Sequence, residues 1–259
     1  MKRMGPRRAA PILKSWREIE LMREAGRIVA QVLAAMEEAA APGMTTADLE
    51  RIAGEIIVDK HKAIPSFKGY HGFPGMICAS LNEEIVHGIP GPRVLQEGDI
   101  VSVDVGAIRK GYHGDAAVTV AVGEIDEESR RLMSVTSEAL RVGIAAAQPG
   151  NWSTDISKAI QNYVESQGFA VVREYTGHGI GRQMHEDPQI PNYYAPGMGR
   201  VRLRPGMTVA LEPMVNAGTW RTRVLADKWT VVTADGKRSA HFEHTIAVTE
   251  NGPRILTAL

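Results

Sequence analysis

The sequence predicts an α+β protein in which two related halves pack around an antiparallel sheet. In the first half, two helical segments precede a strand and a β-hairpin, and the second half repeats this order. The stretch "LQEGDIVSVD" at 95–104 matches "LRPGMTVALE" at 203–212, which aligns Asp104 with Glu212. Neither half is large enough to cover its own sheet, so the two should lie side by side around a pseudo-twofold axis and share one core.

The helices of the first half begin and end at clear local signals. Ser15 and Glu18 form a capping box before a helix predicted for residues 16–40, which a Pro-Gly pair ends. Thr45 or Thr46 then caps a second helix in "ADLERIAGEIIVDKH". A loop rich in glycine and aromatic residues, "FKGYHGFPG", leads to a strand near "MICASL", and the hairpin "IVSVDVGAIRKGYHGDAAVTVAVG" follows.

The second half repeats these signals. "DEESRRLMSVTSEALRVGIAAAQ" has a helical pattern, a second Pro-Gly pair breaks it, and "STDISKAIQNYVESQG" is helical again before the extended "FAVV". Two strands follow, and the later one, "FEHTIAV", aligns Glu243 with Asp115. No low-complexity linker divides the halves. Residues 15–259 are therefore predicted to form a single domain, preceded by a short, basic, flexible tail over residues 1–14.

The composition favours a soluble protein that acts on a pocket-bound ligand. Lys plus Arg and Asp plus Glu both number 30, so no strong field attracts DNA or a membrane, and no apolar run reaches the length of a membrane span. The single cysteine, Cys78, excludes an intramolecular disulfide, and together with the absence of a signal sequence it predicts a cytoplasmic location. The basic start suits a solvated tail, the simpler interpretation, or a contact with ribosomal RNA.

Two aspartates lie in the apolar strands of the first hairpin. A turn centred between residues 109 and 110 would place Asp104 and Asp115 directly opposite one another, and a shift of one residue would leave them diagonal on the same face. Like charges at this range, with little water around them, cannot both stay ionised without a cation. Protonation of one acid, a basic partner or a bound metal would each resolve the conflict.

The duplication favours the metal. If the halves face each other, Glu212 and Glu243 join Asp104 and Asp115, and no single Lys or Arg neutralises four carboxylates, whereas two divalent ions do. Carboxylates with at most one imidazole suit Mn(II), Fe(II), Co(II) or Mg(II) better than a structural zinc. His178, in the Gly-rich "TGHGIG", is the foremost histidine to complete the set.

Six segments together resemble the type I methionine aminopeptidases of bacteria, which belong to peptidase family M24 and have the pita-bread fold. They are "NEEIVHGIPG", "DIVSVDVGA", "YHGDAAVT", "TGHGIGRQMHEDP", "ALEPMV" and "FEHTIAVTENG". The resemblance implies an enzyme with two divalent ions, Co, Mn or Fe(II), and we expect a monomer by default. It would remove the N-terminal methionine of nascent chains, preferably before a small second residue, by attack of a metal-bridging hydroxide.

The resemblance also assigns residues. The implied metal ligands are Asp104, Asp115, His178, Glu212 and Glu243. Glu212 would be the general base, His87 would lie near the scissile amide nitrogen, and His185 near the carbonyl oxygen, so that both histidines also bind substrate. The implied methionine pocket consists of Tyr70, Phe73, Cys78 and Trp229, with Phe67 and Met184 on its rim. Phe67 and Met184 stand where bacterial members typically have Cys and Phe, which affects the shape of the pocket.

Other histidines and other functions have their own expectations. The remaining histidines that we expect to be structural, or to lie behind the ligands, are His71, His113, His241 and His244.

The stretch between His178 and Glu212 is too short for the helical insertion of type II enzymes. A proline-specific peptidase of the same fold usually has an additional N-terminal domain, but here only about fifteen residues precede the first helix. A binding module that has lost catalysis tends to lose acidic ligands, and all five ligands are present here.

Overall fold

A computed structural model describes residues 11–259, so most of the predicted tail lies outside the described residues. Lys14, which the prediction assigned to that tail, is buried at 7% exposure. Its backbone N–H donates to the carbonyl of Gly206 at 2.7 Å, and its ammonium group pairs with Glu186. The chain is therefore held in place from Lys14 onward, because a buried charge and a buried N–H both have partners there.

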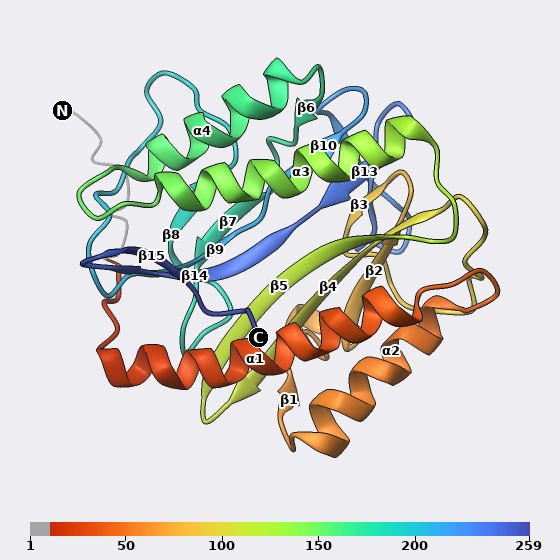
Figure 1. Cartoon of the computed structure of the whole chain (residues 1–259), viewed down its shortest axis with the longest axis horizontal. Coiled ribbons are helices and arrows are strands. Elements are labelled where there is room, and N and C mark those ends of the chain that lie inside the picture. The colour runs from red at the N-terminus through yellow and green to blue at the C-terminus, as the bar shows by residue number, and fades with distance from the viewer. Residues whose placement is uncertain (1–10) are drawn as a thin grey trace.

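A mixed set of short and long strands forms the large sheet, whose order is β1-β4-β5-β14-β9-β7-β8 within residues 11–259, with β2 paired to β4 and β15 to β14. These strands are β1 (Ile64–Pro65), β2 (Ile77–Leu81), β4 (Ile100–Arg109), β5 (Tyr112–Ala121), β7 (Thr176–Gly179), β8 (Glu186–Pro191), β9 (Thr208–Leu211), β14 (Glu243–Thr249) and β15 (Gly252–Ile255). Strands β5 and β14 join the two halves at the centre, in antiparallel register. Figure 1 shows this arrangement.

Two smaller sheets lie beside the large one, in the orders β13-β10-β6 and β11-β12-β3. Their strands are β3 (Glu84–Val86), β6 (Ala170–Val171), β10 (Met214–Asn216), β11 (Thr222–Val224), β12 (Val231–Thr233) and β13 (Ser239–His241). The sheet β11-β12-β3 takes strands from both halves of the chain, whereas all three strands of β13-β10-β6 belong to the second half. The halves are thus connected by hydrogen bonds at more than the central β5–β14 junction.

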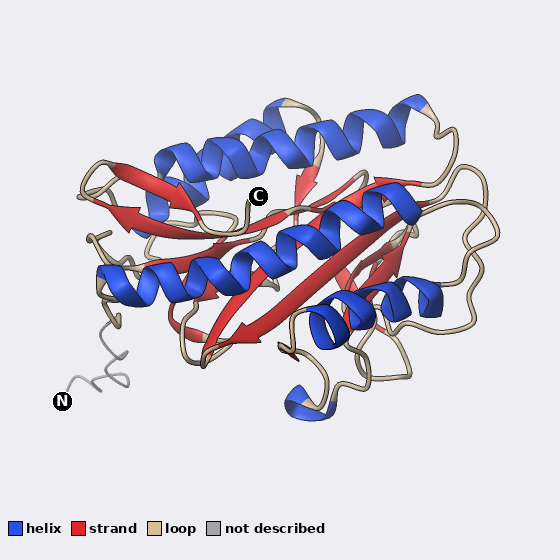
Figure 2. Ribbon diagram, turned by 60° about the horizontal axis from the view of Figure 1, so that its bottom comes forward, coloured by secondary structure: helices blue, strands red, loops and turns tan. Residues whose placement is uncertain are grey.

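All the α-helices cover one face of the large sheet (Figures 1 and 2). The helical segments are α1 (Trp16–Ala39), α2 (Thr46–Gly54) with its π-helical continuation η1 (Glu55–Lys60), the 3₁₀ turn η2 (Tyr70–Gly72), α3 (Glu127–Ala146) and α4 (Ser153–Ser166). One buried apolar cluster joins α1 and α2 to β2, β4 and β5, and a second joins α3 and α4 to β9 and β14. The predicted α+β class with two related halves is confirmed.

The predicted helix starts are confirmed in atomic detail. Ser15 and Glu18 form the expected capping box before α1, and Thr45 forms another with Asp48 before α2. Asp126 caps α3 by accepting from the backbone N–H of Ser129. Caps of this kind each stabilise a helix by about 1 kcal/mol. The local signals alone therefore determine where these helices begin.

The hairpin register is the second of the two predicted arrangements. Asp104 lies opposite Ala117, and Asp115 lies opposite Gly106. The turn consists of Lys110 and Gly111, whose φ values are 51° and 78°. A two-residue turn of this kind needs positive φ at both positions, which glycine adopts without strain. The turn therefore sits one residue later than the directly opposed register requires, and the aspartates are diagonal neighbours.

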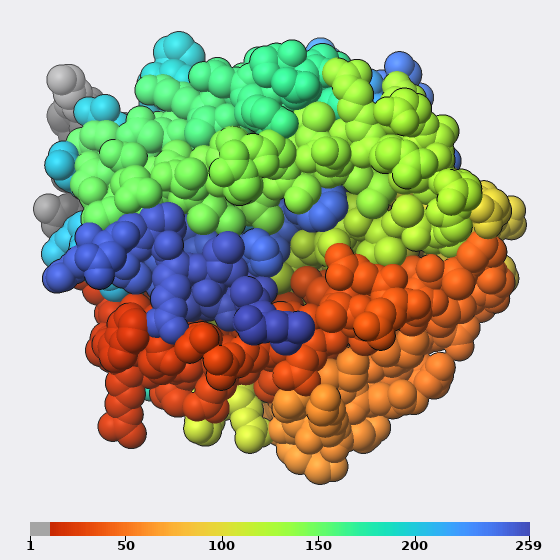
Figure 3. Space-filling model, in the orientation of Figure 1, coloured from red at the N-terminus to blue at the C-terminus, as the bar shows by residue number. Residues whose placement is uncertain are grey.

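The C-terminal residues close the space between the two helix pairs. In Figure 3 they lie between α1 and α3 on the helical face of the molecule. Leu256 is fully buried there. A Cβ atom on Gly26 of α1 would lie 2.2 Å from the Leu256 carbonyl oxygen, so only glycine permits this close approach. In the described part of the chain, no helix combines the length and the apolar character that crossing a membrane requires.

Candidate metal centre and substrate pocket

Strand alternation separates the core from the site. Val103 and Val105 of β4 point into the helix-covered core, so Asp104 between them points to the opposite face. Cys78 pairs with Asp104 across β2 and β4, Asp104 with Ala117, and Ala117 with Glu243 across β5 and β14. One row across four strands therefore carries a thiol and two carboxylates on the face that the helices leave free.

A second row brings in Asp115 and His178. The backbone N–H of Asp115 donates to Thr245 Oγ1 at 3.1 Å, and the Thr245 hydroxyl donates to the Asp115 carbonyl at 2.8 Å. Thr245 pairs with Ala210 across β14 and β9, and Ala210 pairs with His178 across β9 and β7. His178 therefore reaches the site from the second half of the chain, with strands β14 and β9 between its own strand and that of Asp115.

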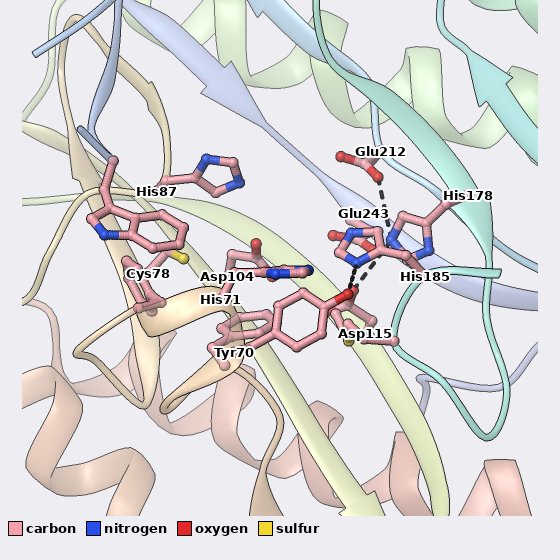
Figure 4. Close-up of a pocket in the computed structure, with 14 residues that line it drawn as sticks. Tyr70, His71, Cys78, His87, Asp104, Asp115, His178, His185, Glu212 and Glu243 are labelled. Carbon is pink, nitrogen blue, oxygen red and sulfur yellow. Dashed lines mark hydrogen bonds and ion pairs between the residues drawn. The ribbon is translucent and has the colours of Figure 1, made fainter.

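The five predicted ligands converge on one pocket (Figure 4). One ligand atom from each of Asp115, His178 and Glu243 lies within 4.8 Å of the others. His178 Nε2 is 3.8 Å from Asp115 Oδ2 and 3.7 Å from Glu212 Oε1. Asp104 lines the same pocket. Side chains separated by more than a hundred residues in sequence thus lie close enough together to share a bound metal ion.

Burial controls the charge of the four carboxyl groups. It raises the pKa of Asp104 to about 7. Burial, and then the charges of neighbouring acids, raises the pKa values of Asp115, Glu212 and Glu243 well above their usual range. No Lys or Arg is among the residues that line this pocket. A carboxylate cluster without a basic partner stays ionised at neutral pH only with cations beside it.

Unpartnered oxygen atoms mark where cations fit. Within residues 11–259, the buried Oδ1 atoms of Asp104 and Asp115 and the buried Oε1 atom of Glu243 have no hydrogen-bond partner. Buried polar atoms in native proteins almost always have a hydrogen-bond partner or a bound ion, so these three oxygens indicate where a cation would bind. Four carboxylates with a single imidazole form a hard, oxygen-rich ligand set that suits divalent Mn, Fe, Co or Mg.

The His178 ring is oriented as a metal ligand requires. Its Nδ1 lies 2.8 Å from the Gly179 carbonyl oxygen, to which only an N–H can donate. The lone pair is therefore on Nε2, the atom that faces Asp115 and Glu212. Burial lowers the pKa of His178 to about 3, which keeps the imidazole neutral at pH 7. No proton has to leave His178 before it binds a cation.

An apolar chamber adjoins the acids. All the residues predicted for the methionine pocket line the same cavity of about 230 Å³, and these are Phe67, Tyr70, Phe73, Cys78, Met184 and Trp229. The rings of Phe73 and Trp229 meet edge to face, with centroids 5.1 Å apart. Burial and the nearby Asp104 raise the pKa of the Cys78 thiol well above its usual range. The Cys78 thiol therefore stays protonated at neutral pH, and Cys78 forms part of the pocket wall rather than a nucleophile.

The two predicted catalytic histidines lie in different parts of the pocket: His185 is beside His178, and His87 stands apart from both (Figure 4). His87 lies beside Trp229, and burial lowers the pKa of His87 to about 4. His185 Nδ1 is 2.8 Å from the Tyr70 hydroxyl oxygen. If that hydroxyl donates to Nδ1, the proton of the neutral His185 ring is on Nε2, where it can be donated to a ligand. Burial lowers the His185 pKa as well, so both rings are neutral at pH 7.

One pocket residue was missed at the level of sequence. His71 lines the cavity with the predicted residues, although we expected it to be structural or to lie behind the ligands. Its φ of 48° in the "GYHG" turn directs the ring differently from a regular strand or helix. The glycines on both sides of Tyr70-His71 are the signal that could have indicated such a turn. The other three histidines do not line this pocket, but His241 Nε2 is buried 3.8 Å from Glu243 Oε2.

Comparisons with known proteins agree with this geometry. Residues 20–250 match the model of metallopeptidase family M24. The chain is 57% identical to a methionine aminopeptidase of Clostridium acetobutylicum over 95% of this chain and 98% of the relative. The crystal structure of a methionine aminopeptidase from Thermotoga maritima superposes with a TM-score of 0.93 at 52% identity, over 96% of this chain and all of the other. The residues matched by the family model span both halves and include the positions of the pocket.

A proline-specific enzyme shares the fold at greater distance. An Xaa-Pro dipeptidase from Bacillus anthracis superposes with a TM-score of 0.74 at 22% identity, over 95% of this chain but 62% of the dipeptidase. Identity at this level shows a common architecture only. The pita-bread fold expected from the sequence is therefore confirmed, since methionine aminopeptidase and dipeptidase neighbours both have it.

Proposed function

Because the chain belongs to metallopeptidase family M24, we propose that it removes the N-terminal methionine from peptides and nascent proteins by hydrolysis of the first peptide bond. The carrying observation is the juxtaposition of four largely buried carboxyl groups, which have no Lys or Arg beside them, with an apolar chamber. The relatives named methionine aminopeptidase, at up to 57% identity, support the same reaction. A small residue in the second position would be preferred if the walls beyond the methionine pocket crowd the next side chain.

Five side chains are proposed to hold two divalent cations. Asp115 and Glu243 lie centrally and would contact both, Asp104 would hold one, and His178 with Glu212 the other. When bound, the cations would supply Lewis acidity, which makes hydroxide available from water near neutral pH and polarises a carbonyl. Mn(II), Fe(II) and Co(II) all suit these oxygen and nitrogen donors.

The remaining steps belong to the chain's own groups. Glu212 is the general base in this proposal, since its side chain is 15% exposed and can exchange a proton with water in the pocket. Glu212 takes a proton from the attacking water and later gives it to the leaving amine, a role typically worth about 10²–10⁴-fold in rate. His185 donates from Nε2 to the developing oxyanion, and the loss of such a donor costs on the order of 10²-fold or more. In the same proposal, His87 would lie near the scissile amide nitrogen.

The apolar chamber selects the side chain. Tyr70, Phe73, Cys78 and Trp229 would surround the methionine, while Phe67 and Met184 form its rim. Burying a methionine side chain is worth about 1.5–3 kcal/mol, and a charged side chain in the same place would have no partner. A polar first residue should therefore be rejected.

A metal-replacement assay tests the proposal. Protein depleted of metal by chelation should not cleave Met-Ala-Ser and should regain activity with Mn(II), Fe(II) or Co(II), whereas Glu-Ala-Ser should stay intact. The Asp104→Asn protein provides a control in which a ligand is lost but the shape is kept. If no metal restores cleavage, the chain is a catalytically inactive binding module, and if Ala-Pro substrates are preferred, it is a proline-specific peptidase.

A cytoplasmic location, a monomeric state and a ribosome contact through the basic N-terminal residues are further parts of this proposal, which the sequence alone supports. Size-exclusion chromatography with light scattering tests the monomer. Co-sedimentation with ribosomes, with and without residues 1–10, tests the contact.

A further inference from the structure

A buried ion pair outside the pocket joins the chain ahead of α1 to the loop that carries Met184 and His185. The ammonium group of Lys14 contacts Glu186 Oε2, and both side chains are only 4% exposed. Lys14 Nζ also donates to the Ile12 carbonyl at 3.2 Å. Removing one partner of such a buried pair leaves an uncompensated charge, so the pair strongly constrains both segments.

The contacts around this pair hold the loop from several sides. Glu186 Oε1 accepts from the backbone N–H of Gln183 at 3.2 Å, within the loop itself. A Cβ atom on Gly181 would lie 2.5 Å from Lys14 Cε and 2.6 Å from Glu186 Oε1, so the loop backbone packs directly on the pair. Lys14 is anchored in turn by its backbone bond to Gly206. Lys14 is therefore held in place by its own backbone, and its ion pair and packing restrict the movement of the loop.

His185 depends on this loop for its position. It directly precedes Glu186 in the chain, and within residues 11–259 its ring makes one hydrogen bond, to Tyr70. The His185 ring centroid is 4.2 Å from that of His178, so a small movement of the loop changes its distance from the metal ligands. Well-placed donors lose much of their effect when they move by about 1 Å.

We propose that Lys14 is a positioning residue for His185. Its ion pair with Glu186 fixes the loop so that the His185 ring faces the carbonyl oxygen of the scissile bond. This inference rests on the proposed function, because it assigns His185 a contact with the reacting group. Lys14 itself lies outside the pocket and touches no substrate.

Lys14→Met removes the charge at nearly constant length and should lower kcat for Met-Ala-Ser by about ten- to a hundred-fold, with KM changing much less. The informative measurement is a double-mutant cycle. In a His185→Ala background the same change should cost less than about two-fold, because the group that it positions is already absent. An equal loss in both backgrounds would overturn the proposal.

Two further variants separate positioning from general damage. Lys14→Met combined with Glu186→Gln removes the uncompensated charge, so its melting temperature should approach that of the wild type while kcat stays low. Recovery of full kcat in this double variant would show that only the stray charge mattered, and would overturn the proposal. Lys110→Met is the matched control, since it breaks an exposed 2.9 Å ion pair with Glu24 and should leave kcat unchanged.

A spectroscopic readout keeps the inference distinct from the proposed function. The imidazole ¹⁵N and ¹H resonances of His185 should shift in Lys14→Met and stay in place in Lys110→Met, whether or not Met-Ala-Ser is a substrate. Unmoved His185 resonances in Lys14→Met refute the positioning role. Absence of cleavage by the wild-type protein, with shifted resonances in Lys14→Met, would refute the proposed function alone.

Discussion

Loading metal at pH 7 should release several protons from the buried acids. The pKa of Asp104 is about 7, so Asp104 holds about half a proton at that pH. Burial raises the pKa values of Asp115, Glu212 and Glu243 well above their usual range, so these groups keep their protons to higher pH than ordinary carboxyl groups do. Since His178 is already neutral, the protons released on cation binding come from the carboxyl groups, and we expect more than one to leave.

Isothermal titration calorimetry of the metal-depleted protein with Mn(II) measures this number directly. The apparent heat is recorded at one pH in buffers of different ionisation enthalpy, and its slope against that enthalpy is the number of protons released. The number of protons released should fall between pH 6 and pH 8, because Asp104, whose pKa is about 7, loses its own proton over this range before the metal is added. Apparent affinity should rise with pH in proportion.

A release of one proton or fewer at pH 7 would refute this reasoning. Water in the site can itself supply one proton on metal binding, so such a value would mean that the four acids were already ionised. Glu20→Gln is the matched control, because it removes an exposed carboxyl group that pairs with Arg254 on the surface, and it should leave the count unchanged.

Three further predictions address the base, the packing and the thiol. Glu212→Gln should lower the turnover of Met-Ala-Ser by about 10²–10⁴-fold while the melting temperature stays within a few degrees, and near-normal turnover would remove Glu212 from the role of base. Gly106→Ala should lower the free energy of unfolding in urea by about 1–3 kcal/mol, because the added Cβ would lie 2.7 Å from Ser66 Cβ; an unchanged midpoint would contradict that packing. Cys78 should react with a disulfide reagent at pH 8 far more slowly in the folded protein than in urea, since burial raises its pKa, and equal rates would show that the thiol is accessible.

Much of the architecture could be predicted because it depends on neighbours in sequence. The capping boxes at Ser15 and Thr45 involve residues three positions apart, and the strand alternation around Asp104 has a period of two. The internal duplication linked Asp104 to Glu212 and Asp115 to Glu243 before any distance was known. These are short-range or repeated patterns, and they persist in the folded chain.

Other features depend on contacts that no local pattern encodes. The turn at Lys110-Gly111 selected the diagonal register from two that the sequence allowed, because the strands must match their partners on both sides. The left-handed backbone at His71 brought an unexpected ring into the pocket.

By itself, then, the sequence determined which side chains have metal-binding chemistry and which strand face carries them. The tertiary structure alone decided that Lys14 meets Glu186 across 172 positions of the chain, and that His178 completes the site from the third strand beyond that of Asp115. The physical reason is that such pairings are set by how the two halves pack on each other, where burial makes an unpaired charge costly and so determines its partner.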